Sequence, residues 1–282
     1  MKRVLVTGKS SFIGNAFQEY VARWNDVHEK EEQILIDKIS LRTDEWKQMD
    51  FSEYDAVLHL AGIAHVDIGK KAQQDIELAE RYHRVNCELT LQVADKAKTE
   101  GVKQFIFMSS IIVFGDSAPI SRTKMITAET KPEPKGFYGQ SKLDAESGLQ
   151  ERESEEFRVC IVRPPMVYGE GCKGNYPKLK KIAGISPIFP KVYNQRSVIS
   201  VEHLCHEIAS CICEGRRGIL HPQDAEYRCV SEWVKEMAQE QGHVIWLVPG
   251  FAWLFRLLER PLPIIDKIFG NLTYARQEKE TV

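Results

Sequence analysis

The hydrophobic residues of this chain form short runs that are separated by longer segments with helical spacing. Short apolar runs predict strands, and apolar residues at every third or fourth position predict amphipathic helices. The predicted strands are 3–6, 34–41, 56–61, 104–109, 158–162 and 197–201. The predicted helices are 12–24, 73–100, 138–155, 175–184, 202–214 and 231–241. Strands that alternate with helices favour an α/β fold, a doubly wound parallel sheet covered by helices on both faces.

A glycine-containing turn and a helix follow the first predicted strand directly. The turn reads T-G-K-S-S-F-I-G from Thr7 to Gly14. Strand, turn and helix in this order place the pyrophosphate of a dinucleotide at a helix N-terminus. Gly8 permits the tight turn and Gly14 lets the helix pack closely on the sheet, while Ser11 stands in place of the usual middle glycine. The residues expected to contact the cofactor here are Gly8, Ser10, Ser11, Phe12, Ile13 and Gly14.

A tyrosine and a lysine one helical turn apart carry the candidate chemistry. Tyr138 and Lys142 lie on one face of a predicted helix, and Ser109-Ser110 ends an earlier strand. A free tyrosine is a poor base at neutral pH, but a nearby ammonium group favours its phenolate form. A serine hydroxyl can hold the same substrate oxygen. This set predicts the interconversion of an alcohol and a ketone by hydride transfer.

Together these motifs resemble the extended short-chain dehydrogenase/reductase family, in its NAD-dependent epimerase/dehydratase branch that acts on nucleotide sugars. The resemblance covers about residues 2–230. Four further motifs support it, V-L-H-L-A-G at 57–62, Y-H-R-V-N at 82–86, F-M-S-S-I-I-V-F-G at 107–115 and R-P-P-M-V-Y-G at 163–169. It implies a Rossmann domain over 1–168 and a smaller C-terminal substrate-binding lobe over 169–282, with 197–214 returning to the first domain.

The resemblance also implies roles for individual residues. Ser110, Tyr138 and Lys142 are the expected catalytic residues, since Ser110 aligns with the family's serine. Further expected cofactor contacts are Asp50, Phe51, Leu60, Ala61, Gly62, Asn86 and Pro164, besides Tyr138 and Lys142. The expected substrate contacts are His65, Ser110, Asn175 and Arg196, with Arg196 on the nucleotide diphosphate. Asp50 can equally be a helix or turn cap, and His65 an ordinary loop histidine.

The choice between NAD and NADP depends on the end of the second strand. An acidic residue there binds the adenosine ribose and favours NAD, whereas a basic residue accommodates the 2′-phosphate of NADP. If the strand ends at Ile36, Asp37 selects NAD. If it continues through Ile39, Ser40 and Arg42 occupy the discriminating turn. The separation of Gly14 from Asp37 is near the usual ~20 residues, so we expect NAD, with NADP as the alternative.

Composition excludes several functional classes. The net charge is −2 and no basic run is interleaved with aromatic residues, so we expect no nucleic-acid partner. The seven cysteines form no C-x-x-C pair, which predicts reduced thiols and no metal site. The nucleotide-binding strand begins almost at residue 1, so we expect no signal peptide, and no apolar run has the length of a spanning helix. We expect a cytoplasmic protein, and the resemblance implies a homodimer.

Three functions fit these residues. The first is a C4 epimerase of a nucleotide sugar, such as a UDP-hexose or UDP-N-acetylhexosamine, in cell-surface polysaccharide synthesis. The second is an NAD(P)H-dependent 4-keto-sugar reductase, which needs the same catalytic residues. The third is a non-catalytic nucleotide-binding scaffold, against which the intact Ser110, Tyr138 and Lys142 argue. A 4,6-dehydratase is disfavoured because Ile111-Ile112 occupy the positions of that branch's Asp-Glu pair.

The segment 244–269 is rich in aromatic and aliphatic residues and contains three prolines. Its prolines and its length rule out a spanning helix. Packing in the core of the lobe or in a dimer is the default expectation. The alternative is an interfacial helix that makes a peripheral membrane contact, with its aromatic residues at the level of the lipid headgroups.

Overall fold

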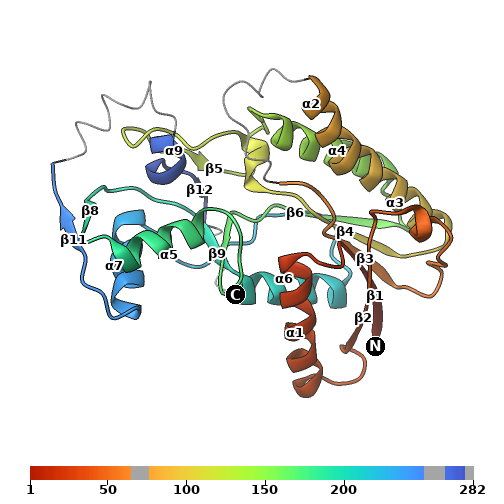
Figure 1. Cartoon of the computed structure of the whole chain (residues 1–282). Coiled ribbons are helices and arrows are strands. Elements are labelled where there is room, and N and C mark those ends of the chain that lie inside the picture. Colours follow the sequence, from red (N-terminus) through yellow and green to blue (C-terminus); the bar gives the residue numbers. More distant parts are fainter. Residues whose placement is uncertain (65–75, 251–263, 277–282) are drawn as a thin grey trace. The chain divides into compact units, whose positions relative to one another are not determined.

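The computed structural model describes residues 1–64, 76–250 and 264–276 (Figure 1). Contacts divide the chain into two compact units. Unit 1 comprises 1–115, 132–165 and 200–222, and unit 2 comprises 116–131, 166–199 and 223–282. The loop 116–131 therefore belongs with the later part of the chain, and the segment that returns to unit 1 is 200–222.

Unit 1 is built on a six-stranded parallel sheet with the spatial order β10-β6-β4-β3-β1-β2. The strands are β1 (Lys2–Thr7), β2 (Ile34–Ile39), β3 (Ala56–His59), β4 (Gln104–Met108), β6 (Arg158–Val162) and β10 (Gly218–Leu220). The order reverses between β1 and β3. In sheets of this kind ligands bind outside the carboxyl ends of the strands at such a switch point.

Helices cover both faces of this sheet. They are α1 (Phe12–Val27), α2 (Ile76–His83), α3 (Leu89–Thr99), α4 (Phe137–Arg152) and α6 (Val201–Glu214). Three shorter turns are η1 (Asp44–Lys47), the π-helical turn η3 (Arg84–Glu88) and η4 (Ile111–Phe114). Helix α1 packs on α6, whereas α2 and α3 pack on α4, and Figure 1 shows these two groups on opposite faces of the sheet.

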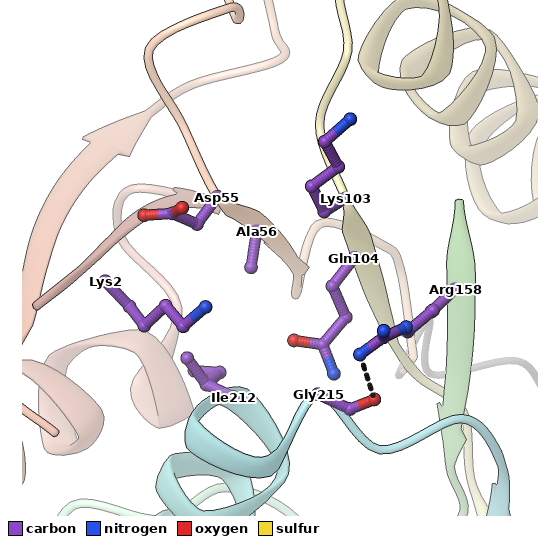
Figure 2. Close-up of a pocket in the computed structure, with 8 residues that line it drawn as sticks. All are labelled: Lys2, Asp55, Ala56, Lys103, Gln104, Arg158, Ile212 and Gly215. Atoms are coloured by element: carbon purple, nitrogen blue, oxygen red, sulfur yellow. Dashed lines mark hydrogen bonds between the residues drawn. The ribbon is translucent and has the colours of Figure 1, made fainter. Parts of the chain in front are cut away.

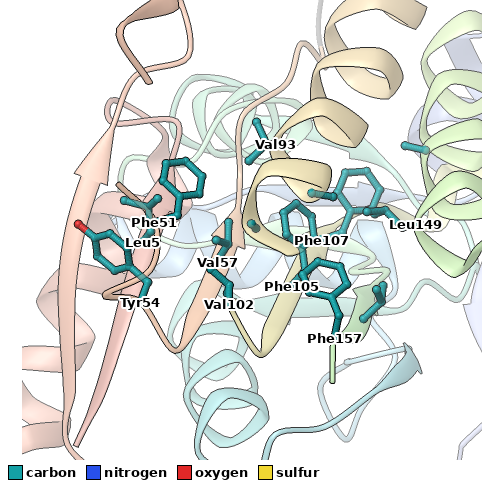
Figure 3. Packing of buried hydrophobic residues seen from close by; sticks show 14 of the residues in the cluster. Leu5, Phe51, Tyr54, Val57, Val93, Val102, Phe105, Phe107, Leu149 and Phe157 are labelled. Atoms are coloured by element: carbon teal, nitrogen blue, oxygen red, sulfur yellow. The ribbon is translucent and has the colours of Figure 1, made fainter. Parts of the chain in front are cut away.

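The core between the sheet and α3/α4 is rich in aromatic residues (Figure 3). Phe105 and Phe107 point from β4 to one face of the sheet because alternate residues of a strand share a face. Both are fully buried, as is Phe157 at the start of β6. Close packing of this kind fixes the strand ends above it, which rigid positioning of a reactive site requires.

Unit 2 consists of short elements around a second core. They are β5 (Met125–Ile126), β7 (Met166–Tyr168), α5 (Asn175–Ile185), β8 (Ile188–Pro190), β9 (Val198–Ser200), α7 (Val230–Glu240), β11 (Trp246–Val248), α9 (Ile264–Phe269) and β12 (Thr273–Tyr274). Helix α5 packs on α7, and Trp233 of α7 lies against Tyr168 and Tyr176. Strand β8 pairs with β11, and β5 with β12.

The predicted α/β class with a parallel, doubly wound sheet is confirmed. For 244–269, the alternative expectation of an interfacial helix is wrong at 246–248, which form a strand. Ile245 and Phe269 are buried in the second core, whereas Val244 and Trp246 are largely exposed. Residues 251–263 of that segment lie outside the described residues. Within the described part of the chain, no helix combines the length and the apolar character needed to cross a bilayer.

Candidate active site

Two adjacent serines follow β4 at the carboxyl end of the sheet and have different partners. The Ser109 side chain is buried and donates a hydrogen bond to Glu146. Ser110 caps the turn η4, where its oxygen accepts a hydrogen bond from the Ile112 amide at 3.3 Å. Its side chain is also hydrogen-bonded to the phenol of Tyr138. The structure therefore places Ser110, and not Ser109, beside the candidate acid–base residue.

Tyr138 lies in the first turn of α4, and a glycine brings that turn close to η4. A Cβ added at Gly139 would lie 3.0 Å from the carbonyl oxygen of Ile112 and 2.9 Å from Pro134, so a larger residue would push α4 away. Burial raises the pKa of Tyr138 to about 12, while the hydrogen bond from Ser110 lowers it. Without a further positive charge the side chain is a phenol at neutral pH.

Lys142 occupies the next turn of α4 and is buried. Its ammonium donates to the carbonyl oxygen of Met108 at 2.8 Å and lies 4.4 Å from the centre of the Phe107 ring. Burial lowers its pKa to about 8, and the charge of Glu146 opposes this shift. Its amine nitrogen would also be 3.5 Å from a Cβ at Gly62, so this ammonium lies under the loop that follows β3.

Glu146 was not among the predicted site residues, although it follows Lys142 by one more helical turn. Its carboxylate is buried and paired with Arg163, whose Nε lies 3.1 Å from Oε1. Arg163 in turn lies 3.5 Å from Nε2 of His221. The signal in the sequence was the spacing of four between Lys142 and Glu146, which places both on the face of α4 that carries Tyr138. The carboxylate of Glu146 is the negative charge that acts on Lys142.

Asn86 lies in η3 and is fully buried. Its amide nitrogen donates to the carbonyl of Ile63 at 2.9 Å and to the hydroxyl of Ser141 at 3.0 Å. Its amide oxygen accepts from the Ile63 amide at 2.8 Å. The Ser141 hydroxyl donates onward to the carbonyl of Tyr138 at 2.9 Å. Asn86 thus ties the loop after β3 to α4, and a direct contact with the cofactor stays a prediction.

His59 at the end of β3 extends this network towards the nucleotide turn. Thr90 donates to the Asn86 carbonyl at 2.8 Å, so its oxygen accepts from Nε2 of His59 at 3.0 Å. Nδ1 of His59 then accepts from the hydroxyl of Thr7 at 3.1 Å. Burial lowers the pKa of His59 to about 3, which keeps the ring neutral in this tautomer. One chain of hydrogen bonds therefore connects Thr7 to the helix of Tyr138.

The turn after β1 has the geometry that a dinucleotide requires. Gly8 has a φ of +82°, and a Cβ there would lie 3.1 Å from the Ala61 amide nitrogen. Ser11 caps α1, and its side chain accepts from the Gly14 amide at 3.0 Å. Ser11 stands where the usual motif has its middle glycine, and its hydroxyl serves as the N-cap of α1. The 16-residue helix α1 begins here, so its positive end faces the position of a pyrophosphate.

The observed end of β2 decides whether the strand stops at Ile36 or continues through Ile39. The strand continues through Ile39, which pairs with Thr7, and Asp37 pairs with Leu5 inside the strand. The carboxylate of Asp37 accepts from Arg3 at 3.2 Å and from the Tyr54 hydroxyl at 3.1 Å. Asp37 is therefore not the residue at the end of the strand, as the shorter register had assumed. Ser40, Arg42 and Lys9 are the side chains around that end, and the Lys9 amide bonds the Ile39 carbonyl at 2.9 Å.

The other predicted cofactor residues have different surroundings. The Asp50 carboxylate accepts from the Ser52 amide at 2.8 Å, which makes it a turn cap, and hydrogen bonds from the side chain and then the backbone of Ser52 lower its pKa. The Phe51 ring is fully buried and packs in the first core, among residues of the sheet. Pro164 is buried and its carbonyl accepts from the Ile111 amide at 3.0 Å. Leu60 and Ala61 lie in the loop that contacts Gly8. Ser10 is exposed, and Phe12 and Ile13 are half-buried at the start of α1.

Two of the predicted substrate residues, Asn175 and Arg196, belong to unit 2. Asn175 is exposed at the first position of α5. The guanidinium of Arg196 donates to the Ser117 hydroxyl at 2.7 Å and to the Ile268 carbonyl at 3.2 Å. Burial lowers its pKa to about 10. Arg196 thus joins the loop 116–131 to the end of α9, and contact with a diphosphate stays a prediction. His65 lies outside the described residues.

A pocket at the opposite, amino edge of the sheet contains none of the predicted site residues (Figure 2). It is lined by Lys2, Asp55, Ala56, Lys103, Gln104, Arg158, Ile212 and Gly215. Gln104 donates to the carbonyls of Cys211 and Arg216, and Arg158 donates to that of Gly215 at 3.4 Å. Among the described residues, no three His, Cys, Asp or Glu side chains are gathered as metal ligands.

The chain is similar to several known proteins. The sequence profile of the NAD dependent epimerase/dehydratase family matches residues 4–185. A UDP-glucose 4-epimerase from Vibrio cholerae is 28% identical over 96% of this chain and 86% of its own length. A GDP-6-deoxy-D-mannose reductase from Pseudomonas aeruginosa is 33% identical over 62% of this chain and 55% of its own length. The solved dTDP-glucose 4,6-dehydratase from Streptomyces venezuelae has a similar fold, with a TM-score of 0.69 at 18% identity over 98% of this chain and 88% of that one.

Proposed function

Because this chain belongs to the NAD-dependent epimerase/dehydratase family, we propose that it transfers hydride at C4 of a nucleotide hexose, with C4 epimerisation as its reaction. The resemblance to the extended short-chain dehydrogenases is confirmed by the family match. The observation that carries the proposal is the set of Ser110, Tyr138 and Lys142, brought together at the carboxyl end of the sheet. The breadth of the match to a UDP-glucose 4-epimerase supports the choice of reaction and of a UDP-linked sugar.

The residues around the switch point fit a nicotinamide dinucleotide. The positive φ of Gly8, the close approach of Ala61 and the start of α1 form a site for its pyrophosphate. Lys142, which lies under Gly62, would bind its ribose. When bound, the nicotinamide ring would accept and return the hydride, and in its oxidised form it would add the positive charge that this site needs.

Tyr138 performs the proton transfer in this proposal. Its phenolate takes the proton of the sugar 4-hydroxyl as the C4–H bond breaks, and it returns the proton when hydride comes back to C4 on the other face. Ser110 holds the same sugar oxygen, as general acid–base catalysis requires. The positive charge of a bound, oxidised cofactor would lower the pKa of Tyr138 from about 12, and Lys142 would hold the ribose of that cofactor. Glu146 keeps Lys142 protonated by its own negative charge.

A second reaction, reduction of a 4-keto sugar, is supported by the end of β2. Asp37 is inside the strand and bonded to Arg3, so Arg42, Ser40 and Lys9 surround the turn that contacts the adenosine ribose. Cationic side chains at this turn favour the 2′-phosphate of NADP over NAD. Reductases consume reduced cofactor from solution, and Tyr138 would then donate its proton to the new hydroxyl.

Isotope labelling distinguishes these reactions. The purified chain is incubated with UDP-hexoses and UDP-N-acetylhexosamines deuterated at C4, and in parallel with their 4-keto forms and C4-deuterated NADH or NADPH. An epimerase inverts C4 and retains deuterium there, with no net use of cofactor. A reductase leaves the hexoses unchanged and places one deuterium from the reduced cofactor at C4 of the product. If neither product forms with any of these sugars, the proposed function is wrong.

The cofactor preference has its own test. We expect Arg42→Ala to raise the KM for NADPH by about tenfold and to leave the KM for NADH within twofold, because one phosphate contact is lost. Lys38→Ala is the matched control, since Lys38 lies near the end of β2, before Arg42, and its ammonium is bonded to Asn15 at 2.6 Å. Equal effects of Arg42→Ala on both cofactors would remove Arg42 from the ribose site.

A further inference from the structure

Unit 2 contains a two-stranded ribbon that is apolar on both faces. Strands β8 and β11 pair in parallel, with Ile188 opposite Trp246. The inner face places Phe189, Ile245 and Leu247 in the second core. The outer face is also apolar, although it is exposed. A ribbon with one buried face normally places polar residues on the other face, so this outer face calls for a reason.

The exposed residues that form this surface are Ile185, Ile188, Val244 and Trp246. We call this surface the outer ribbon face. The exposed fractions of these residues are 68%, 56%, 71% and 72%. Two hydrogen bonds connect the segments that carry them, one from the Trp246 amide to the Pro187 carbonyl at 2.9 Å and one between the His243 side chain (Nε2) and the Ser186 carbonyl at 2.9 Å. A contiguous, exposed apolar surface of this kind marks an interaction site more often than scattered apolar residues do.

The chain around the outer ribbon face is strongly basic. Residues 171–200 contain five lysines and one arginine and no acidic residue, in a chain with 40 acidic residues and a net charge of −2. Residues 241–250 also contain no acidic residue. On α5, Lys178 and Lys181 precede Ile185 by seven and four positions, so all three lie on one exposed stripe of the helix. This stripe leads directly into β8.

Helix α7, beside α5, carries a row of exposed acidic residues. Helix α7 packs on α5 and exposes Glu232, Glu236 and Glu240 at intervals of four. Glu236 is paired with Arg228 at 3.1 Å. An anionic partner would therefore contact the end of α5 and the ribbon, and would avoid the acidic stripe of α7. The charge pattern thus gives the surface an orientation.

We propose that the outer ribbon face and the lysines of α5 dock unit 2 on an anionic phospholipid bilayer. Indole and branched aliphatic side chains partition into the headgroup region, and lysines on the same stripe attract anionic lipid. A second copy of the chain fits less well, because a two-fold contact would place Lys178 and Lys181 against the same lysines. The proposal is independent of the reaction and of its cofactor.

Vesicle flotation with the full chain tests this docking. The chain is mixed with vesicles of phosphatidylcholine alone and of phosphatidylcholine with phosphatidylglycerol, at low and high salt. We expect binding to the anionic vesicles that falls as salt rises. The variant Ile188→Ser/Trp246→Ser and the variant Lys178→Glu/Lys181→Glu should each bind at least about tenfold more weakly. The matched control is Val27→Ser/Leu35→Ser, which removes two exposed apolar residues of unit 1 and should bind like the parent.

Three measurements keep the outcome decisive. The thermal midpoint of each variant must equal that of the parent, which is expected because these side chains are exposed. Turnover of a water-soluble nucleotide sugar should also be unchanged, so a failure of docking is distinct from a failure of the proposed reaction. Absence of binding to anionic vesicles, or equal binding of the Ile188→Ser/Trp246→Ser variant, would overturn the proposal. A dimer in solution that this variant dissociates would assign the face to self-association instead.

Discussion

The two edges of the six-stranded sheet both contain charged side chains but use them differently. At the carboxyl edge Lys142, Glu146 and Arg163 are buried, bonded to one another or to strand ends, and close to Tyr138. At the amino edge the pocket of Figure 2 is lined by Lys103 and Arg158, whose side chains are exposed to solvent. The pocket of Figure 2 is therefore not the place where charge has been removed from water.

This difference teaches how the site can be reactive. Taking a charge out of water costs free energy, so a buried ammonium persists only where other groups stabilise it. At the carboxyl edge that cost changes the pKa of Lys142 to about 8 and that of Tyr138 to about 12. Both groups then respond to the arrival of one further charge. Exposed side chains at the amino edge are screened by solvent, which makes such coupling weak.

The largest expected effect is the loss of turnover when Tyr138 at the carboxyl edge is changed. Tyr138→Phe keeps the ring but removes the proton-transfer group, so we expect turnover to fall by about 10²–10⁴-fold or more, with cofactor affinity within twofold of the parent. Tyr54→Phe is the matched control, because it removes the same hydroxyl just before β3, where that hydroxyl donates to Asp37 at 3.1 Å. Steady-state kinetics and cofactor titration measure both. Retained turnover in Tyr138→Phe would remove this residue from the mechanism.

The second effect concerns the buried ion pair. Glu146→Gln leaves the guanidinium of Arg163 without its charge partner, so we expect the free energy of unfolding to fall by about 3–5 kcal/mol. Asp55→Asn is the control at the amino edge, where the half-buried carboxylate accepts from the Arg3 amide at 2.7 Å, and we expect about 1 kcal/mol there. Urea unfolding of the two variants gives the comparison. Equal losses would show that burial at the carboxyl edge has no special cost.

A third effect is the pH dependence of the unfolding free energy that His59 causes at the carboxyl edge. The pKa of His59 is about 3 in the folded chain, below its ordinary 6.5, so between these values the unfolded chain binds more protons. Stability that is present above pH 6.5 is therefore lost as pH falls towards 3, by about 1.4 kcal/mol per pH unit. His59→Asn removes this titration, so its unfolding free energy should depend less steeply on pH. Urea midpoints from pH 7 to pH 4 measure the slope, and parallel slopes would contradict the burial of a neutral imidazole.

Much of the carboxyl edge could be predicted from the sequence, because local pattern determines it. Helical spacing placed Tyr138 and Lys142 on one face, and the apolar runs placed Ser110 at a strand end. The partners of Glu146 and His59 could not be predicted, since Arg163 and Thr7 are distant in the sequence and meet only across the sheet. The last residue of β2 could not be decided from the sequence either, because Ile36 and Ile39 are equally suitable as the end of a strand. Its pairing with β1 decides it.

The smallest expected effect belongs to the amino edge, and it is the one most able to break the comparison. Arg158 and Lys103 line the pocket but are exposed, and Arg158 contributes one hydrogen bond of 3.4 Å to the Gly215 carbonyl. A contact of that length at the surface is weak, so Arg158→Ala and Lys103→Ala should change the unfolding free energy by about 0.5 kcal/mol or less. Both should leave kcat/KM within twofold, because no buried group depends on either charge. A tenfold loss of kcat/KM in either variant would mean that the amino edge takes part in the reaction, and the division of the sheet into a reactive and a structural edge would then be wrong.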